Sequence, residues 1–149
     1  MKINKDVIAE LSPCESRFNN YLAHYNDFNG DLSEFIKLEN ITYGDKVWVF
    51  IRLATKEQNV KWAALCAKSV LHVFETKYPN DKRPRQAIDA ILNNEINSEV
   101  RKSTYAADAA YAAAYAAYDA VADAAYDAVA DVVKTNQQNL NLKLMLEAI

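Results

Sequence analysis

Glycine and proline are scarce in this sequence of 149 residues, which holds two glycines and three prolines. Neither residue type occurs in residues 86–149. All-β folds need turn-forming residues at short intervals, so this scarcity argues against a strand-rich second half. We therefore expect an all-α fold, an orthogonal or bundled set of helices with a long C-terminal helix rich in alanine, tyrosine and aspartate.

Residues that carry catalytic or cofactor chemistry are also few. The two histidines, His24 and His72, have no cysteine, histidine or carboxylate at metal-ligand spacing on the same helical face. The sequence has no phosphate-binding glycine-rich loop, nucleophile elbow or zinc-protease motif. We therefore expect a protein-binding role, with no enzymatic activity, no metal and no cofactor.

The charge and the cysteines indicate the compartment and narrow the range of partners. A formal net charge of -3 is too small to predict direct binding to nucleic acid or to a membrane surface. Cys14 and Cys66 are far apart, and the first residues lack the apolar stretch of a signal peptide. We therefore expect a cytoplasmic protein. Aspartates interrupt the alanine-rich tract, so we expect no membrane-spanning helix.

Helix signals divide the chain into three segments of one expected domain. We expect variable helices over residues 1–45, a helical core over 46–97, and over 98–149 a long alanine-rich helix followed by a short one. Ser12 and Glu15 have the spacing of a capping box, with Pro13 at the first helical position. The predicted helix runs to about Tyr25, with Phe18, Leu22 and Tyr25 on one face.

Further helix starts follow along the chain. Asp31 and Glu34 begin a predicted short helix that reaches Leu38. Residues 42–45 are expected to form a turn, and residues 46–53 a helix, because no second strand exists to pair with them. Thr55 and Gln58 form another predicted capping box ahead of a helix over 56–77. Its expected buried stripe is Val60, Ala63, Ala64, Ala67, Val70, Leu71 and Phe74. A last helix of the core segment is expected to start at Arg83-Pro84. The residues of this helix expected to face the core are Ala87, Ile88, Ile91 and Leu92.

The tract from Ser98 to Lys134 contains an internal repeat, since residues 117–123 recur as 125–131. Alanine favours a continuous helix here, and the aspartates and tyrosines fall on neighbouring faces. The candidate partner-binding residues are Asp108, Tyr111, Tyr115, Tyr118, Asp119, Asp123, Tyr126, Asp127 and Asp131. For the aspartates, a solvated face that keeps the helix soluble is favoured over a binding surface, whereas the tyrosines suit a binding surface and ordinary core packing equally. After a polar break at 136–139, we expect a short helix over 140–146.

The segment from Tyr78 to Arg85 is a rigid polar connection between two hydrophobic helices. Asp81 is placed to cap the second helix, and Arg83 or Arg85 can pair with Asp81, Asp89 or Glu75. A structural role is favoured over a ligand site. The expected structural motif comprises Trp62, Tyr78, Asp81, Arg83, Pro84 and Arg85.

This region carries a family resemblance. Residues 62–67, Val70-Leu71, Phe74-Glu75 and the run 78–88, which includes Tyr-Pro and Arg-Pro-Arg, resemble a family of helical immunity-type proteins of bacterial polymorphic toxin systems. Relatives of that kind occur in phages and prophages, and Gly44 to Trp48 is also similar to them. The resemblance implies an all-α fold and binding to a cognate toxin.

Three functional hypotheses follow. The first is an immunity-type inhibitor that occludes a toxin or effector, which a neighbouring toxin gene would favour. The second is a phage-encoded counter-defence protein that binds a host defence complex or a signalling ligand, which a phage genome would favour. The third is a structural module that forms homo-oligomers through its alanine-rich helix, which self-association without another ligand would favour.

Overall fold

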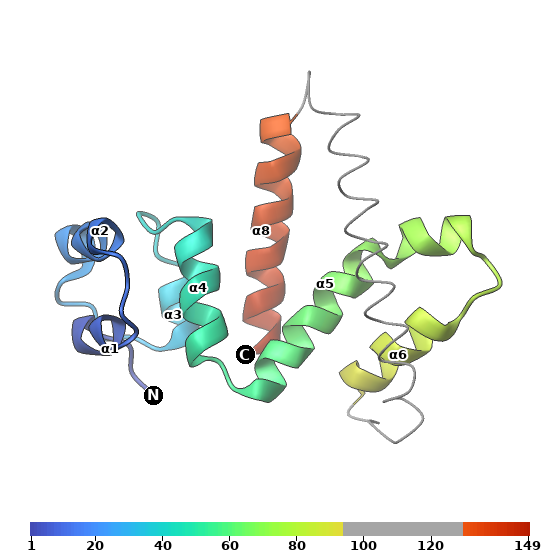
Figure 1. Cartoon of the computed structure of the whole chain (residues 1–149), viewed down its shortest axis with the longest axis horizontal. Coiled ribbons are helices and arrows are strands. Elements are labelled where there is room, and N and C mark those ends of the chain that lie inside the picture. Colours follow the sequence, from blue (N-terminus) through green and yellow to red (C-terminus); the bar gives the residue numbers. More distant parts are fainter. Residues whose placement is uncertain (94–129) are drawn as a thin grey trace. The chain divides into compact units, whose positions relative to one another are not determined.

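The computed structural model describes residues 1–93 and 130–149, which form seven helices and no strand (Figure 1). The helices are α1 (Lys5–Glu10), α2 (Glu15–Tyr25), α3 (Leu32–Ile36), α4 (Tyr43–Leu53), α5 (Lys56–Lys77), α6 (Arg83–Leu92) and α8 (Ala130–Ala148). The all-α prediction is confirmed. The described helices include none that is long and apolar enough to cross a membrane.

The chain divides into two compact units. The first unit comprises residues 1–59 together with 145–149, and the second comprises the described part of residues 60–144. The boundaries fall within α5 and α8, so each of these helices contributes to both units.

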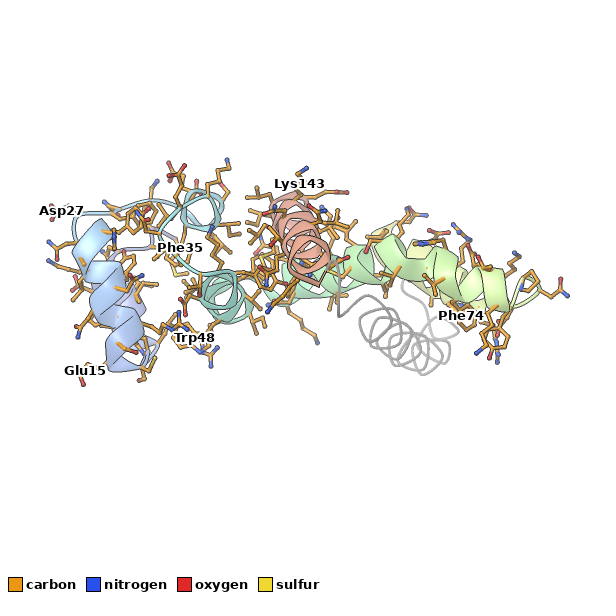
Figure 2. The ribbon with its side chains drawn as sticks, turned by 90° about the horizontal axis from the view of Figure 1, so that it is seen from above. Glu15, Asp27, Phe35, Trp48, Phe74 and Lys143 are labelled. Carbon is orange, nitrogen blue, oxygen red and sulfur yellow. The ribbon has the colours of Figure 1, made fainter. Side chains whose placement is uncertain are left out.

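Aromatic side chains from α2 and α3 build the core of the first unit. Tyr21 and Phe35 are almost fully buried, and their ring centroids lie 6.2 Å apart. Figure 2 labels Phe35 within this unit. Phe18, Leu22 and Tyr25 pack against the same cluster, as their helical spacing predicted. Rings at such distances add attraction beyond simple area burial.

A pair of backbone hydrogen bonds ties the first residues of the chain to the turn before α3. The amide of Ile3 donates to the carbonyl of Gly30 at 2.6 Å, and the amide of Gly30 donates to the carbonyl of Ile3 at 3.2 Å. A Cβ on residue 30 would lie 2.4 Å from the end of the Phe28 ring. Glycine therefore allows the backbone to approach an aromatic ring that belongs to the core.

The first helix was not predicted from the sequence. The Asn4 side chain accepts hydrogen bonds from the amides of Asp6 and Val7, both at 3.0 Å, and so caps the start of α1. The helix has only six residues and buries only Ile8. An amphipathic pattern needs more turns than this to be visible in a sequence.

The predicted capping box at Ser12 and Glu15 is wrong. The amide of Ser12 donates to the carbonyl of Ala9 at 3.0 Å, and Ser12 has a φ of 57°, so it ends the preceding helix. A left-handed residue just after a helix is a common helix terminator. Helix α2 instead begins after Cys14, which provides no side-chain cap.

Two other helix starts lie where they were predicted, and both carry a capping box, of which only the one at Thr55 was predicted. The predicted end of α3 at Leu38 is wrong, because α3 ends at Ile36. Asp31 accepts a hydrogen bond from the amide of Glu34, whose carboxylate accepts one from the amide of Asp31. Thr55 and Gln58 make the same reciprocal pair. Each box satisfies two amides that would otherwise lack partners.

The predicted turn at residues 42–45 is wrong, because these residues begin α4. Thr42 is the N-cap, and its Oγ1 accepts a hydrogen bond from the amide of Asp45 at 3.2 Å. The helical prediction for residues 46–53 is confirmed, and Val49 and Phe50 are buried. Lys46 is also buried, and desolvation lowers the pKa of its amine.

In the second unit, α5 packs on α6. Ala64 and Leu71 of α5 form a buried cluster with Ile88 of α6, and Ala67, Ile91 and Leu92 pack against it. Helix α5 has the predicted bounds, but its predicted buried stripe is only partly correct. Val60 and Ala63 are exposed, whereas Leu65, which was not predicted, is buried.

The predicted break at residues 136–139 and the separate short helix after it are wrong, because α8 continues from Ala130 to Ala148. The Gln137 side chain donates to Asn141 Oδ1 at 2.9 Å, four residues further along. Polar side chains at this spacing support a helix. The described residues do not include 98–129, so the predicted long helix lies mostly outside them.

Candidate functional site

Most of the predicted partner-binding residues fall outside the described part of the chain. Asp131 lies in the first turn of α8. Outside the described residues lie Asp108, Tyr111, Tyr115, Tyr118, Asp119, Asp123, Tyr126 and Asp127.

The structure does describe the connection between α5 and α6, which the sequence predicted as a structural motif. Helix α5 ends at Lys77, and the amide of Tyr78 donates to the carbonyl of Phe74 at 2.8 Å. The amide of Asp81 donates to the carbonyl of Tyr78 at 3.1 Å, which closes the turn. Pro84 in the first turn of α6 needs no amide partner there and is buried.

Asp81 and Arg83 form a tight local pair before α6. Arg83 donates from Nε at 2.9 Å and from Nη2 at 2.6 Å to the two carboxylate oxygens of Asp81. The backbone amide of Arg83 also donates to Asp81 at 3.1 Å. The side-chain and backbone hydrogen bonds from Arg83 lower the pKa of Asp81 to about 2. Asp81 therefore binds the start of α6 as an anion, although the N-cap position itself is Lys82.

Glu75 and Arg85 form a second pair, across the turn. Arg85 donates from Nε at 2.6 Å and from Nη2 at 2.5 Å to the two oxygens of Glu75. These side-chain hydrogen bonds lower the pKa of Glu75. A two-point arginine–carboxylate pair fixes orientation as well as distance. The pair thus links the last turns of α5 to the first turn of α6.

An aromatic side chain extends this surface on α5. The Tyr78 ring lies 5.0 Å from the Phe74 ring, centroid to centroid, and is about half exposed. Lys77 Nζ lies 5.6 Å from the centre of the Tyr78 ring. Figure 2 labels Phe74 near this end of α5. Trp62 lies earlier in α5 and is mostly covered rather than part of this surface.

The sequence predicted the pairing of Arg83 with Asp81 and of Arg85 with Glu75, but only among several possible partners for these arginines. Asp89 was the other predicted partner, and it instead lies 3.9 Å from Lys68 Nζ. The position of Lys77 beside Tyr78 was missed. Residues 75–85 hold four basic and two acidic side chains. This excess of basic residues was the sequence signal that could have indicated a lysine beside Tyr78.

One histidine and one cysteine have environments that argue against a catalytic role. His24 Nδ1 lies 2.9 Å from the carbonyl of Asn20 in its own helix. Burial raises the pKa of the Cys66 thiol to about 11, so this thiol is neutral and poorly nucleophilic near pH 7. Within residues 1–93 and 130–149, no three histidine, cysteine or carboxylate side chains gather as a metal site requires.

A comparison with protein families identifies the chain. Residues 50–139 match the family model described as Imm-5 like putative immunity protein. The chain belongs to this family. The match covers α5, α6 and the turn between them, so the two arginine–carboxylate pairs lie within the Imm-5 like region. The searches of curated proteins and of solved structures found no match to this Imm-5 like chain.

Proposed function

We propose that this chain is an immunity-type inhibitor, which binds a protein toxin or effector and occludes it. The observation that carries the proposal is the match of residues 50–139 to the Imm-5 like family. A protein partner is consistent with that family. Inhibition through binding requires a stable surface, and it does not require catalytic groups in the inhibitor.

The structure supports a binding role through its ordered exposed groups. The turn between α5 and α6 presents two arginines and a tyrosine, which are residue types enriched at the energetic centres of protein interfaces. Hydrogen bonds within the chain fix the side chains of the two arginines, so binding would order few additional side chains.

The test begins with the genes that flank the gene for this chain: a neighbouring gene whose expression stops growth is the candidate toxin for co-expression. Expression of the toxin alone should stop growth, and co-expression of the unaltered chain should restore it. The purified chain should also retain a catalytically inactive form of the toxin on an affinity column. Continued growth arrest with the chain present at equal or higher level would refute the proposal. Self-association without toxin binding would instead indicate an oligomerising module.

The aspartates predicted to bind the partner form a separate part of the proposal. We call them the aspartate stripe: Asp108, Asp119, Asp123, Asp127 and Asp131. The triple variant Asp119→Lys, Asp123→Lys, Asp127→Lys should weaken binding to the toxin, because it reverses the charge of the predicted contact surface. A matched control reverses the same number of exposed carboxylates in the first unit, Glu10, Asp27 and Glu39. Unchanged binding by the triple stripe variant would show that the stripe is only solvated surface.

A further inference from the structure

The two arginine–carboxylate pairs share an arrangement that leaves the cations outermost. The Arg83 side chain is 71% exposed, whereas its partner Asp81 is 25% exposed. The Arg85 side chain is 45% exposed, whereas Glu75 is 19% exposed. In each pair, the carboxylate is therefore the more covered member, and the surface that solvent meets is formed mainly by guanidinium groups.

Each guanidinium group also keeps part of its hydrogen-bonding capacity. Arg83 and Arg85 both use Nε and Nη2 to bind their carboxylates. Among the described residues, Nη1 of neither arginine takes part in a hydrogen bond or an ion pair shown by the structure. A guanidinium group has five N–H donors in a rigid plane. The unused edge can therefore bind an external oxygen while the carboxylate still fixes the plane.

The surroundings of the arginines add to the positive charge and supply an apolar contact. Lys77 and Lys82 are exposed on the same turn, which holds four basic and two acidic side chains between Glu75 and Arg85. The half-exposed Tyr78 ring lies beside Lys77. The turn thus combines a modest positive charge with a flat aromatic face.

We infer that the turn between α5 and α6 is a contact surface for an acidic protein segment, which supplies carboxylate and carbonyl oxygens to Arg83 and Arg85 and packs on Tyr78. This inference rests on the proposed inhibitory function and names the chemistry of the surface on the toxin. It is distinct from the aspartate stripe, which would need basic residues on its partner.

Charge complementarity favours an acidic protein over a nucleic acid. Asp81 and Glu75 lie directly beneath the arginines and would repel a continuous row of phosphates. The whole chain also carries a formal net charge of -3. A protein segment places single carboxylates between neutral groups, so it brings fewer negative charges near Asp81 and Glu75 and meets less of that repulsion.

The experiment measures binding of the full chain to an inactive form of the toxin that the co-expression test identifies. The variants are Arg83→Glu, Arg85→Glu and the double variant. Each should weaken the affinity at least ~10-fold, as truncation of an interface arginine commonly does. The affinity of the unaltered chain should fall as salt is added, and the double variant should show a smaller salt dependence. A polyglutamate peptide should compete with the toxin, whereas a duplex DNA oligonucleotide should not.

The matched control is Arg17→Glu in the first unit. Arg17 also pairs with an acidic partner, Asp45, at 3.2 Å, and its side chain is 53% exposed. Arg17→Glu should leave the affinity unchanged, and thermal unfolding of all variants confirms that they are folded. Unchanged binding by the double variant would overturn the inference, and so would an equal loss with Arg17→Glu or competition by DNA.

Failure of the unaltered chain to bind the toxin would have a different meaning. It would overturn the proposed function, and the contact surface with it. Strong binding by the unaltered chain that is indifferent to Arg83 and Arg85 would overturn the contact surface alone. The binding of the unaltered chain to the toxin therefore distinguishes failure of the proposed function from failure of the contact surface alone.

Discussion

The Tyr21 hydroxyl predicts an unusual response to a conservative substitution. Tyr21 is 3% exposed, and its hydroxyl is buried without a hydrogen-bond partner among the described residues. A buried polar group without a partner costs about 1–3 kcal/mol. Tyr21→Phe keeps the ring, which packs against Phe18 and Phe35, and removes only the oxygen. We therefore expect Tyr21→Phe to stabilise the first unit by about 1 kcal/mol.

Tyr25→Phe is the matched control, because the Tyr25 hydroxyl does have partners. It accepts hydrogen bonds from the amides of Glu39 at 3.2 Å and Asn40 at 3.3 Å. Its removal leaves these amides without that acceptor and should destabilise the unit by about 1 kcal/mol. The same chemical change thus has opposite expected signs at two neighbouring positions of α2.

Urea unfolding followed by the fluorescence of Trp48 measures both effects, because Trp48 packs against the core of the first unit. The comparison uses a Trp62→Phe background, so that Trp48 is the only tryptophan. A loss of more than about 1 kcal/mol in Tyr21→Phe would refute the reasoning, since it would show that the hydroxyl makes a favourable bond.

The same variant has an expected pH dependence. Burial raises the pKa of Tyr21 above its ordinary value of 10.0, so the folded state holds this proton more tightly than the unfolded state does. The unfolded state then loses its proton first as the pH rises. Stability should therefore fall above about pH 10 in the unaltered chain, and this fall should be smaller in Tyr21→Phe.

Three further predictions concern Lys46, Asp81 and Thr55. Lys46→Met should stabilise the chain at pH 7, because burial lowers the pKa of the Lys46 amine and so disfavours its charged form in the fold. Urea unfolding should show a gain in the free energy of unfolding, and this gain should shrink as the pH rises toward 10.5. Carbon-detected NMR titration should find the Asp81 carboxyl pKa at about 2. In Arg83→Ala this pKa should rise only part of the way to the ordinary value, because the backbone amide of residue 83 still donates to Asp81. The contribution of this pair to stability is present above about pH 4 and is lost as the pH falls toward 2. An Asp81 pKa near 3.8 in the unaltered chain would contradict the pairing. Thr55→Ala removes the cap of α5 and should cost about 1 kcal/mol in the same unfolding assay, and no change would show that the cap is dispensable.

Local signals made much of the fold predictable. The capping box at Thr55 and the helix start at Asp31 were predictable because the residues that signal each lie within three positions of one another. The breakers near Pro79 and Pro84 likewise placed the end of α5 and the start of α6. The box at Ser12 failed because Ser12 instead ends α1, a helix too short to show a pattern.

Other features depend on contacts that spacing alone does not determine. Glu75 and Arg85 are ten residues apart, and only the packing of α5 on α6 selects this pairing over Asp89. The polar run at Asn136 to Asn139 resembles a break, yet Gln137 bonds along the helix to Asn141. The arginine side chains are more exposed than the carboxylates that they bind, and this difference likewise arises from the folded turn.

The most direct test of the account is a titration, with the purified chain, of the toxin that the co-expression test identifies. The activity of the toxin is followed as increasing amounts of this Imm-5 like protein are added. The account predicts that activity falls in proportion to the added chain and is abolished near a fixed molar ratio. Full toxin activity in the presence of a large excess of folded chain would contradict it.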